Sequence, residues 1–431
     1  MAYVKKQGKG YKIVVSNGTD INGKKIRETA TFTPDPNMTA KQQEKALEVF
    51  VFEFEQKVKS GKVLKGEKLT LKEYVDMWLR DYAKNHLEFT SYQSYEYNMN
   101  TKILPALGHI KLSELKPHHI QSLYNNLLED GVRVDGKKGS YSIGTIKKCH
   151  VALSSALNRA MYWQMIESNP CVRVELPKSK NMASDIKYFT LEQTERFLSA
   201  LDQTYTATYK PHTRTDDTGK VYQVSEYTES RDIPTQFKVF FYIALFGGLR
   251  CGELLALTWD DIDFTTSSIS ITKSITLADG NPVIKAPKTE TSIRTITLPS
   301  IVMQLIKQYK IEQYEYRLSL GDQWIGDNHL FIQWNGKLMN KSTPYHTFKR
   351  IIKKYNATVT NEKDKLPQIP LHGLRHTSAT LLIAEKVDVK TVSARLGHSQ
   401  TSTTMDIYAH ALKELDKKAS DALEQAFKKT I

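Results

Sequence analysis

Histidine, arginine and tyrosine side chains recur at short spacings between positions 371 and 410. His372 and Arg375 stand three positions apart, and His398 and Tyr408 follow them. An arginine guanidinium binds two phosphate oxygens at once and keeps its proton, whereas a tyrosine hydroxyl, with a pKa of ~10, is a poor nucleophile until it is activated. The combination therefore predicts a phosphodiester that is attacked by a tyrosine.

Helix-forming sequence separates these side chains. Thr377–Glu385 carries several apolar residues, and Val389, Val392 and Leu396 recur at near-helical spacing up to Gly397, a residue type that often ends a helix. The polar residues thus fall where helices begin and end. At such positions side chains leave the core and backbone groups are free to contact a ligand.

Two other interpretations of these residues were weighed. His372 and His376 are four apart and could be metal ligands on one helical face, but no acidic or cysteine third ligand stands at a motif spacing. We therefore predict no metal site and no cofactor. Tyr408 alone could be a core aromatic, so the signal lies in the combination. His376 and His410 are interpreted as structural neighbours of the site.

The motifs resemble the C-terminal signature of the tyrosine recombinases, the integrases of phages and conjugative transposons. In that family a His-x-x-Arg pair, a Gly-His pair and a later tyrosine complete the active site. His372 and Arg375 match the first pair, Gly397 and His398 match the second, and Tyr408 matches the tyrosine. The resemblance extends to nearly the whole chain.

A second motif resembles the first catalytic arginine box of the same family. It reads ALFGGLRCGELLALTW from Ala244 to Trp259 and contains Arg250. The paired glycines before Arg250 let the backbone turn, so that the guanidinium points out of a helix start. By analogy with the family, Glu253 braces this structure and is not catalytic.

Three segments alternate β-branched and polar residues and predict a three-stranded sheet. They are Ser268–Leu277, Pro282–Ala286 and Ser292–Leu298. The turn between the second and third segments holds Lys288. The resemblance implies that a lysine on this turn is the general acid, and Lys288 fits the Pro-Lys-Thr pattern better than its rival Lys285 does.

Composition indicates the kind of partner. The 431 residues include 61 Lys and Arg against 47 Asp and Glu, a net charge of +14, which favours a polyanion such as nucleic acid. The three cysteines form no CxxC pair, no apolar run has transmembrane length, and the opening residues lack the apolar core of a signal peptide. We expect a bacterial cytoplasmic, nucleoid-associated protein that does not contact a membrane.

Residues 1–60 predict a basic module in which a three-stranded sheet is covered by a helix. The strands are expected near residues 3–4, 11–15 and 29–32. The helix opens at Thr39 and should cover the sheet with Ala46, Val49, Phe50 and Phe54. The resemblance implies an arm-type DNA-binding domain. Its predicted DNA-binding residues are Lys5, Lys6, Lys9, Lys12, Lys24, Lys25 and Arg27.

The remaining chain divides into two further predicted domains. Residues 66–176 have helical periodicity and resemble the core-binding helical domain of the family. Residues 185–431 form the catalytic domain, with a capping-type helix start at Thr190 and an amphipathic C-terminal tail helix that packs on its own domain or on a neighbouring protomer. Residues 202–234 interrupt the helical pattern as an inserted loop or hairpin.

The predicted fold is multidomain and mainly α with small β-sheets, the catalytic domain being α+β. The resemblance implies site-specific strand exchange for a mobile element. Tyr408 would attack, Arg250, Arg375 and His398 would hold the phosphate, His372 would assist proton removal, and Lys288 would protonate the leaving oxygen. Expected partners are double-stranded DNA at core and arm sites, a tetramer of this chain, an excisionase and a DNA-bending host protein. A type IB topoisomerase-like enzyme and a catalytically silent DNA-binding regulator remain the alternatives.

Overall fold

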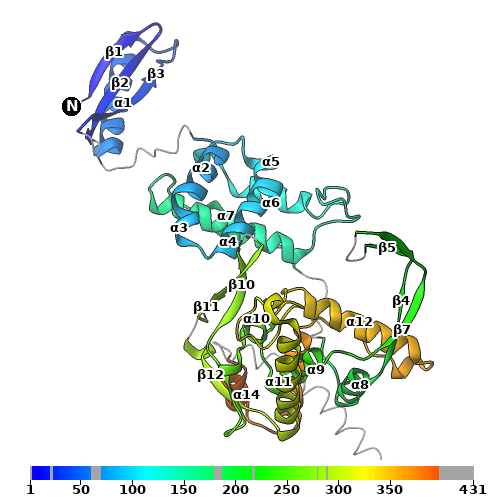
Figure 1. Cartoon of the computed structure of the whole chain (residues 1–431). Coiled ribbons are helices and arrows are strands. Elements are labelled where there is room, and N and C mark those ends of the chain that lie inside the picture. Colours follow the sequence, from blue (N-terminus) through cyan, green and yellow to red (C-terminus); the bar gives the residue numbers. More distant parts are fainter. Residues whose placement is uncertain are drawn as a thin grey trace, which may run out of the picture. The chain divides into compact units, whose positions relative to one another are not determined.

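The computed structural model of the chain describes residues 2–19, 23–59, 69–178, 187–215, 219–278, 280–287 and 290–397. It divides into two compact units, Met1–Met182 and Ala183–Ile431, whose elements are labelled in Figure 1. Each unit is treated by itself below. In the described ranges, no helix is long and apolar enough to cross a membrane.

The predicted amino-terminal sheet is confirmed. Strands β1 (Tyr3–Gln7), β2 (Gly10–Thr19) and β3 (Lys25–Phe32) pair antiparallel in that order, and α1 (Ala40–Lys59) packs on them. The prediction that Val49 covers the sheet is wrong. Val49 is 51% exposed, whereas the predicted Phe50 and Phe54 pack on the sheet together with Leu47, Val51 and Val58.

The helical part of the first unit follows its apolar periodicity. Its longer helices are α2 (Leu71–Trp78), α4 (Phe89–Asn98), α6 (Pro117–Asn126) and α7 (Ile143–Tyr162). The short elements are η1 (Leu79–Ala83), α3 (Lys84–His86), η2 (Met99–Ile103), α5 (Leu104–Leu107), η3 (Leu112–Glu114) and η4 (Pro170–Arg173). Tyr74, Val75 and Trp78 lie on one side of α2 and are fully buried. Thr70 caps α2 in a reciprocal capping box with Glu73.

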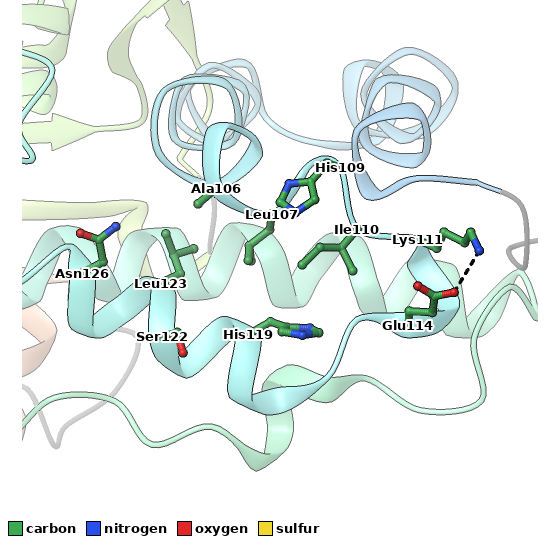
Figure 2. Close-up of a pocket in the computed structure, with 10 residues that line it drawn as sticks. All are labelled: Ala106, Leu107, His109, Ile110, Lys111, Glu114, His119, Ser122, Leu123 and Asn126. Atoms are coloured by element: carbon green, nitrogen blue, oxygen red, sulfur yellow. Dashed lines mark hydrogen bonds and ion pairs between the residues drawn. The ribbon is translucent and has the colours of Figure 1, made fainter.

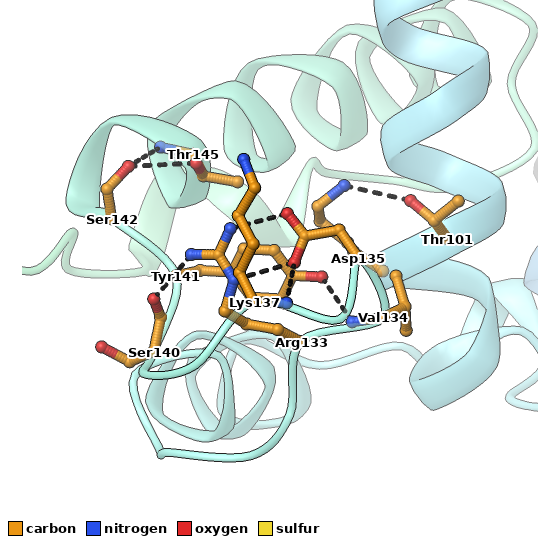
Figure 3. Close-up of polar contacts among 10 residues, drawn as sticks. Thr101, Arg133, Val134, Asp135, Lys137, Ser140, Tyr141, Ser142 and Thr145 are labelled. Atoms are coloured by element: carbon orange, nitrogen blue, oxygen red, sulfur yellow. Dashed lines mark hydrogen bonds and ion pairs between the residues drawn. The ribbon is translucent and has the colours of Figure 1, made fainter.

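An arginine closes the loop between α6 and α7 (Figure 3). Arg133 donates to both carboxylate oxygens of Asp135, at 2.9 and 2.6 Å, and to the Ser140 carbonyl at 3.0 Å. Its guanidinium also lies over the Tyr141 ring. The hydrogen bonds from Arg133 lower the pKa of Asp135 to about 2. These contacts connect the two ends of the loop, which leads into α7 at the helix cap Ser142.

A surface hollow of about 740 Å³ lies between α6 and the segment that follows α5 (Figure 2). His109 and His119 line it together with Leu107 and Leu123, and an ion pair of 3.0 Å joins Lys111 to Glu114 beside it. All the residues that line it belong to the first unit.

The second unit surrounds a large aromatic core. Its helices are α8 (Leu191–Asp202), α9 (Thr235–Gly247), α10 (Cys251–Ala256), α11 (Ser300–Leu320), α12 (Thr343–Thr358), α13 (Gly373–Ala384) and α14 (Val389–Leu396). The rings of Phe197, Phe241 and Phe348 contact one another at centroid distances of 5.2 to 5.7 Å, so α8, α9 and α12 share one core. The predicted helix start at Thr190 is confirmed as a capping box with Gln193.

The predicted three-stranded sheet is wrong in its membership. The sheet consists of β8 (Ile262–Asp263), β9 (Ser268–Ile271) and β12 (Arg294–Thr297), while β10 (Ser274–Ala278) and β11 (Asn281–Lys285) form a separate hairpin. The segment predicted as one strand breaks between β9 and β10 at Lys273. Its ammonium group is held by Asp261 at 3.0 Å and by the Thr258 hydroxyl at 2.9 Å. Beyond this anchor β10 packs against α10 instead of continuing the sheet.

The insertion at residues 202–234 was predicted to be a loop or a hairpin, and the structure shows a hairpin. Strand β4 (Tyr205–Tyr209) pairs with β7 (Tyr227–Arg231), and β5 (His212–Thr215) pairs with β6 (Val221–Val224). At its base the Tyr205 hydroxyl donates to the Ala200 carbonyl, and Thr204 bonds Asp232 at 2.5 Å. The two ends of the insertion therefore meet.

Candidate active site

Arg250 stands where the chain turns from α9 into α10. Gly248 ends α9 with a φ of 66°, and a Cβ there would collide with Leu396 and approach Ser378. Only glycine combines this left-handed backbone with so close a packing of α13 and α14. Arg250 follows in an extended conformation as the cap of α10, and its side chain reaches the surface. The predicted glycine turn is confirmed at Gly248.

Glu253 binds this arginine, which agrees with the bracing role that the family resemblance implied for it. The carboxylate is 3% exposed and accepts hydrogen bonds from the Arg250 Nη1 at 2.8 Å, the Arg250 backbone N–H at 2.9 Å and the Arg294 Nη2 at 2.9 Å. Burial by itself raises the pKa of Glu253, but the bonds and charges of the two arginines lower it below its ordinary value. Glu253 is thus an ionised hub between two guanidinium groups.

Arg375, in the first turn of α13, is 2% exposed. Its Nη1 donates to the Gly248 carbonyl at 2.8 Å, which ties α13 to the turn before Arg250. Its Nη2 is buried and has no hydrogen-bond partner among the described residues. Burial, followed by the charge of Arg250, lowers the pKa of Arg375 to about 9, so it remains a cation at pH 7. A buried cationic donor without a partner is costly, and an anionic ligand would satisfy it.

His372 immediately precedes α13, and its ring reaches the surface on one side. It meets His376 edge to face at 4.9 Å. Partial burial, His376, Arg375 and Arg250 lower the pKa of His372 to about 4. At neutral pH the imidazole is therefore uncharged and can accept a proton.

This environment predicts a measurable titration. In the DNA-free protein the His372 imidazole should titrate near pH 4, and Arg250→Met should raise that midpoint because it removes a positive charge. Since the folded-state pKa lies below the value of about 6.5 for an unfolded histidine, the stability that the neutral ring contributes is lost as the pH falls from about 6.5 toward 4. Nitrogen-15 NMR of the imidazole, assigned with His372→Gln, measures the midpoint. A titration midpoint above pH 6 for His372 in wild-type protein would show that burial and the nearby positive charges do not lower its pKa.

The structure brings together only part of the predicted site. Arg250, His372 and Arg375 belong to one electrostatic neighbourhood, since each arginine acts on the pKa of the histidine. Lys288, His398, Tyr408, His410 and the tail helix lie outside the described residues. The chain does reach the site just before His398, because the Arg250 Nη2 donates to the Gly397 carbonyl at 3.1 Å. Lys285, the rival of Lys288, is exposed at the end of β11.

Sequence reasoning missed two arginines that hold this region together. Arg294 on β12 donates to Glu253 and to the Arg395 carbonyl. Arg395 in turn donates to the carbonyls of Phe246 and Thr297, at 3.0 and 2.9 Å. The sequence offered one signal for Arg294, because it is the only charged residue in a short strand that otherwise consists of threonine and isoleucine.

The predicted DNA-binding residues divide over the two faces and the turns of the amino-terminal sheet. Lys5 lies directly opposite Lys12 in the register of β1 and β2, and both point away from the face that buries Ile13 and Val15. Arg27 pairs with Ser16 and belongs to the same outer face. Lys6 points to the other side of β1, and Lys9 and Lys24 lie in the connections. Lys25 pairs with Thr19, beyond an irregularity in the register between Ser16 and Thr19. Like charges directly opposite each other destabilise a sheet, so the outer face favours an anionic partner.

Two family profiles match the chain. The phage integrase family matches residues 213–414, and the SAM-like N-terminal domain of phage integrases matches residues 70–128. The first match contains Arg250, His372, Arg375 and the positions of His398 and Tyr408.

Similar proteins are integrases and recombinases. A tyrosine recombinase XerC-like protein of Caldanaerobacter subterraneus subsp. tengcongensis is 27% identical, with 99% of this chain and 98% of the relative covered. The ICEBs1 integrase of Bacillus subtilis is 28% identical, with 77% of each chain covered. The Tn1549 transposon integrase, solved in complex with a circular intermediate DNA, shares the fold with a TM-score of 0.59 at 21% identity over 81% of this chain and 99% of that one. Since the family profiles cover both the helical and the catalytic regions and one relative aligns over almost its full length, the chain belongs to the phage integrase family and is a tyrosine recombinase, an enzyme that transfers DNA strands.

Proposed function

We propose that this tyrosine recombinase integrates and excises a mobile genetic element through a 3′-phosphotyrosine intermediate. The observation that carries the proposal is the buried Arg375 Nη2, which has no partner among the described residues and belongs to the same neighbourhood as Arg250 and a neutral His372. Such a group is suited to an oxygen of the scissile phosphate.

Each residue of the site has a role in the proposed reaction. Tyr408 attacks the phosphorus and forms a phosphotyrosine, while the bond to the 5′ oxygen breaks. Arg250 and Arg375, together with His398, hold the nonbridging oxygens as negative charge builds on them. His372 accepts the tyrosine proton or hydrogen-bonds the phosphate, and its low pKa keeps it available as an acceptor.

Lys288 is proposed to protonate the departing 5′ oxygen. The covalent bond to the protein preserves the energy of the phosphodiester, so the second strand can be joined without ATP. Removal of Mg²⁺ by a chelator should leave the cleavage step unchanged, because guanidinium groups supply the positive charge that a metal supplies elsewhere.

The charge balance supports a phosphate ligand. Among the described residues, Arg250 and Arg294 both donate to the buried carboxylate of Glu253, and the charge of Glu253 also acts on the pKa of the buried Arg375. Burial is the main cause that lowers the pKa of His372, Arg375 and Arg395, and the neighbouring arginine charges lower these pKa values further. An entering phosphodiester would offset these positive charges, which favours binding of the anion and of the more highly charged transition state.

The proposed partners are double-stranded DNA and further copies of the chain. The solved relatives include a lambda integrase dimer bound to a core site and the Tn1549 integrase on circular intermediate DNA. By analogy we propose that the helical region binds core sites, that the amino-terminal module binds arm sites, and that strand exchange takes place in a tetramer. An excisionase and a DNA-bending host protein would set the direction of the reaction in a bacterial cytoplasm.

A joining assay tests the function. The DNA that flanks the gene is sequenced for an attachment-site repeat, and two copies of it are placed on one supercoiled plasmid. Recombination should resolve the plasmid into two circles with a transient covalent protein–DNA adduct. Relaxation without resolution would favour the topoisomerase-like alternative, and binding without any adduct would favour the silent regulator.

The amino-terminal module gives a separate prediction. Replacing Lys5 and Lys12 with glutamine should leave cleavage of an isolated core site intact and reduce recombination on a complete attachment site at least tenfold, because phosphate contacts are lost from the outer face. Deletion of residues 1–60 should have the same effect in stronger form. The matched control replaces Lys41 and Lys45 on the exposed side of α1. Equal recombination by both pairs would show that the outer face does not bind arm sites.

A further inference from the structure

We infer that Arg294 is a positioning residue of the recombination reaction, which orients Arg250 and fixes the backbone at Gly397, the residue directly before His398 in the chain. This inference rests on the proposed function and deepens it. It is carried by the hydrogen bonds of Arg294, which connect three segments of the chain that are distant in sequence.

The guanidinium of Arg294 is used on all three nitrogens. Its Nη2 donates to Glu253 at 2.9 Å, its Nε to the Arg395 carbonyl at 2.7 Å, and its Nη1 to the Ser292 carbonyl at 3.0 Å. The side chain is only 7% exposed. Because every nitrogen already donates to protein, Arg294 is not arranged to bind the phosphate itself. In this it differs from Arg375, whose Nη2 has no partner in the described part of the chain.

The first connection runs through Glu253 to Arg250. The Glu253 Oε1 accepts from the Arg250 side chain, and its Oε2 accepts from Arg294 and from the Arg250 backbone. Without Arg294 the buried carboxylate would lose one of two compensating charges. The carboxylate would then become protonated or rotate, and either change would weaken its hydrogen bonds with Arg250.

The second connection runs to the turn that precedes His398. Gly397 ends α14 with a φ of 66°, and a Cβ at that position would come within 2.8 Å of the Arg294 Nη1 and 3.2 Å of its Cζ. The guanidinium of Arg294 therefore packs directly on the glycine. The Arg250 Nη2 donates to the Gly397 carbonyl at 3.1 Å, so two arginines joined by one carboxylate hold the same turn.

The third connection reaches the strand that follows the lysine turn. Arg294 begins β12, and its bond to the Ser292 carbonyl closes the short η6 helix (Glu290–Ser292) onto the strand. The segments containing Arg250, Gly397 and Ser292 thus meet at a single side chain. A displacement of that side chain would disturb Arg250 and the backbone at Gly397 together.

The test is a single-turnover measurement with full-length protein on a nicked core-site substrate. Arg294→Met should lower the cleavage rate about 10²-fold, as expected when a catalytic group is displaced by about 1 Å, while the Kd for the core site changes less than threefold. Arg294→Lys keeps the charge opposite Glu253 but not the bonds to Arg395 and Ser292, so its rate should lie between those of wild type and Arg294→Met. A loss of DNA affinity in parallel with the rate would overturn the inference.

A double-mutant cycle separates positioning from general stabilisation. In an Arg250→Met background, Arg294→Met should cost less than tenfold further, because part of its effect acts through the arginine that has been removed. Equal losses in both backgrounds would show a structural role only. The matched control is Arg196→Met, which removes an arginine that pairs with Asp364 at 2.9 Å and donates to the Lys363 carbonyl. It should leave the cleavage rate unchanged.

A second readout does not depend on activity. In DNA-free protein the Arg250 Nε–H resonance should shift and broaden in Arg294→Met, and it should stay in place in Arg196→Met at matched thermal stability. If wild-type protein forms no adduct, the proposed function fails, and the resonance still decides whether Arg294 orients Arg250. An unchanged resonance in Arg294→Met would overturn the inference whatever the activity.

Discussion

Tyr408→Phe protein is expected to bind its core site with wild-type affinity and to form no covalent adduct on a nicked suicide substrate. The substitution removes a single hydroxyl, so DNA contacts are preserved while the nucleophile is lost. Denaturing gel electrophoresis of labelled DNA measures the adduct, and a mobility-shift titration measures affinity.

Two other tyrosines serve as controls for this prediction. Tyr345 is partly exposed at the start of α12. Tyr355, on the same helix, is buried in the hydrophobic core of the second unit. Tyr345→Phe should form the adduct at the wild-type rate. If Tyr408→Phe formed an adduct at wild-type level, the nucleophile would be another tyrosine, and the exposed Tyr345 would be examined before the buried Tyr355.

Lys288→Ala is expected to slow cleavage by ~10²- to 10⁴-fold, the usual contribution of a general acid. The departing 5′ oxygen is a strongly basic alkoxide that must then leave without a proton. A substrate with sulfur at the bridging position leaves as a thiolate and needs none. Lys288→Ala should therefore cleave the sulfur substrate at nearly the wild-type rate.

The control for sulfur rescue is a residue that contacts nonbridging oxygens. Arg375→Lys keeps the charge but loses the bond to the Gly248 carbonyl and the second nitrogen, so its defect should persist on the sulfur substrate. Lys285→Ala should cleave both substrates normally. Rescue of Lys285→Ala, without rescue of Lys288→Ala, would move the general acid to the end of β11.

The sequence predicted best those features that depend on local chemistry. The turn at Gly248 follows from paired glycines before an arginine, the start of α8 from a capping box, and the first sheet from β-branched runs between turns. The hydrogen bond of Glu253 to Arg250 spans only three residues and so could be foreseen. Each of these features depends on residues that are close together in the sequence, so it can be predicted without knowledge of the tertiary contacts.

Features set by tertiary contacts were missed or wrong. Arg294 meets Glu253 across 41 positions and the Arg395 carbonyl across 101, and no periodicity signals either contact. The predicted sheet included the hairpin strand β11 in place of β8, because alternation does not show which strands pair. Lys102 is another example. It is buried against the Tyr97 ring at 4.1 Å, although lysine is normally placed on the surface by its charge.

The hairpin inserted between α8 and α9 has a consequence for tolerance to change in length. Because Thr204 bonds Asp232 at its base and the Tyr205 hydroxyl is fixed to α8, everything beyond those residues can be lengthened or shortened without altering where the two helices begin and end. Insertions and deletions are accepted where chain ends already meet at a surface. This stretch is therefore where a fluorophore or an epitope can be carried while Arg250 and Arg375 keep their hydrogen bonds to Glu253 and Gly248.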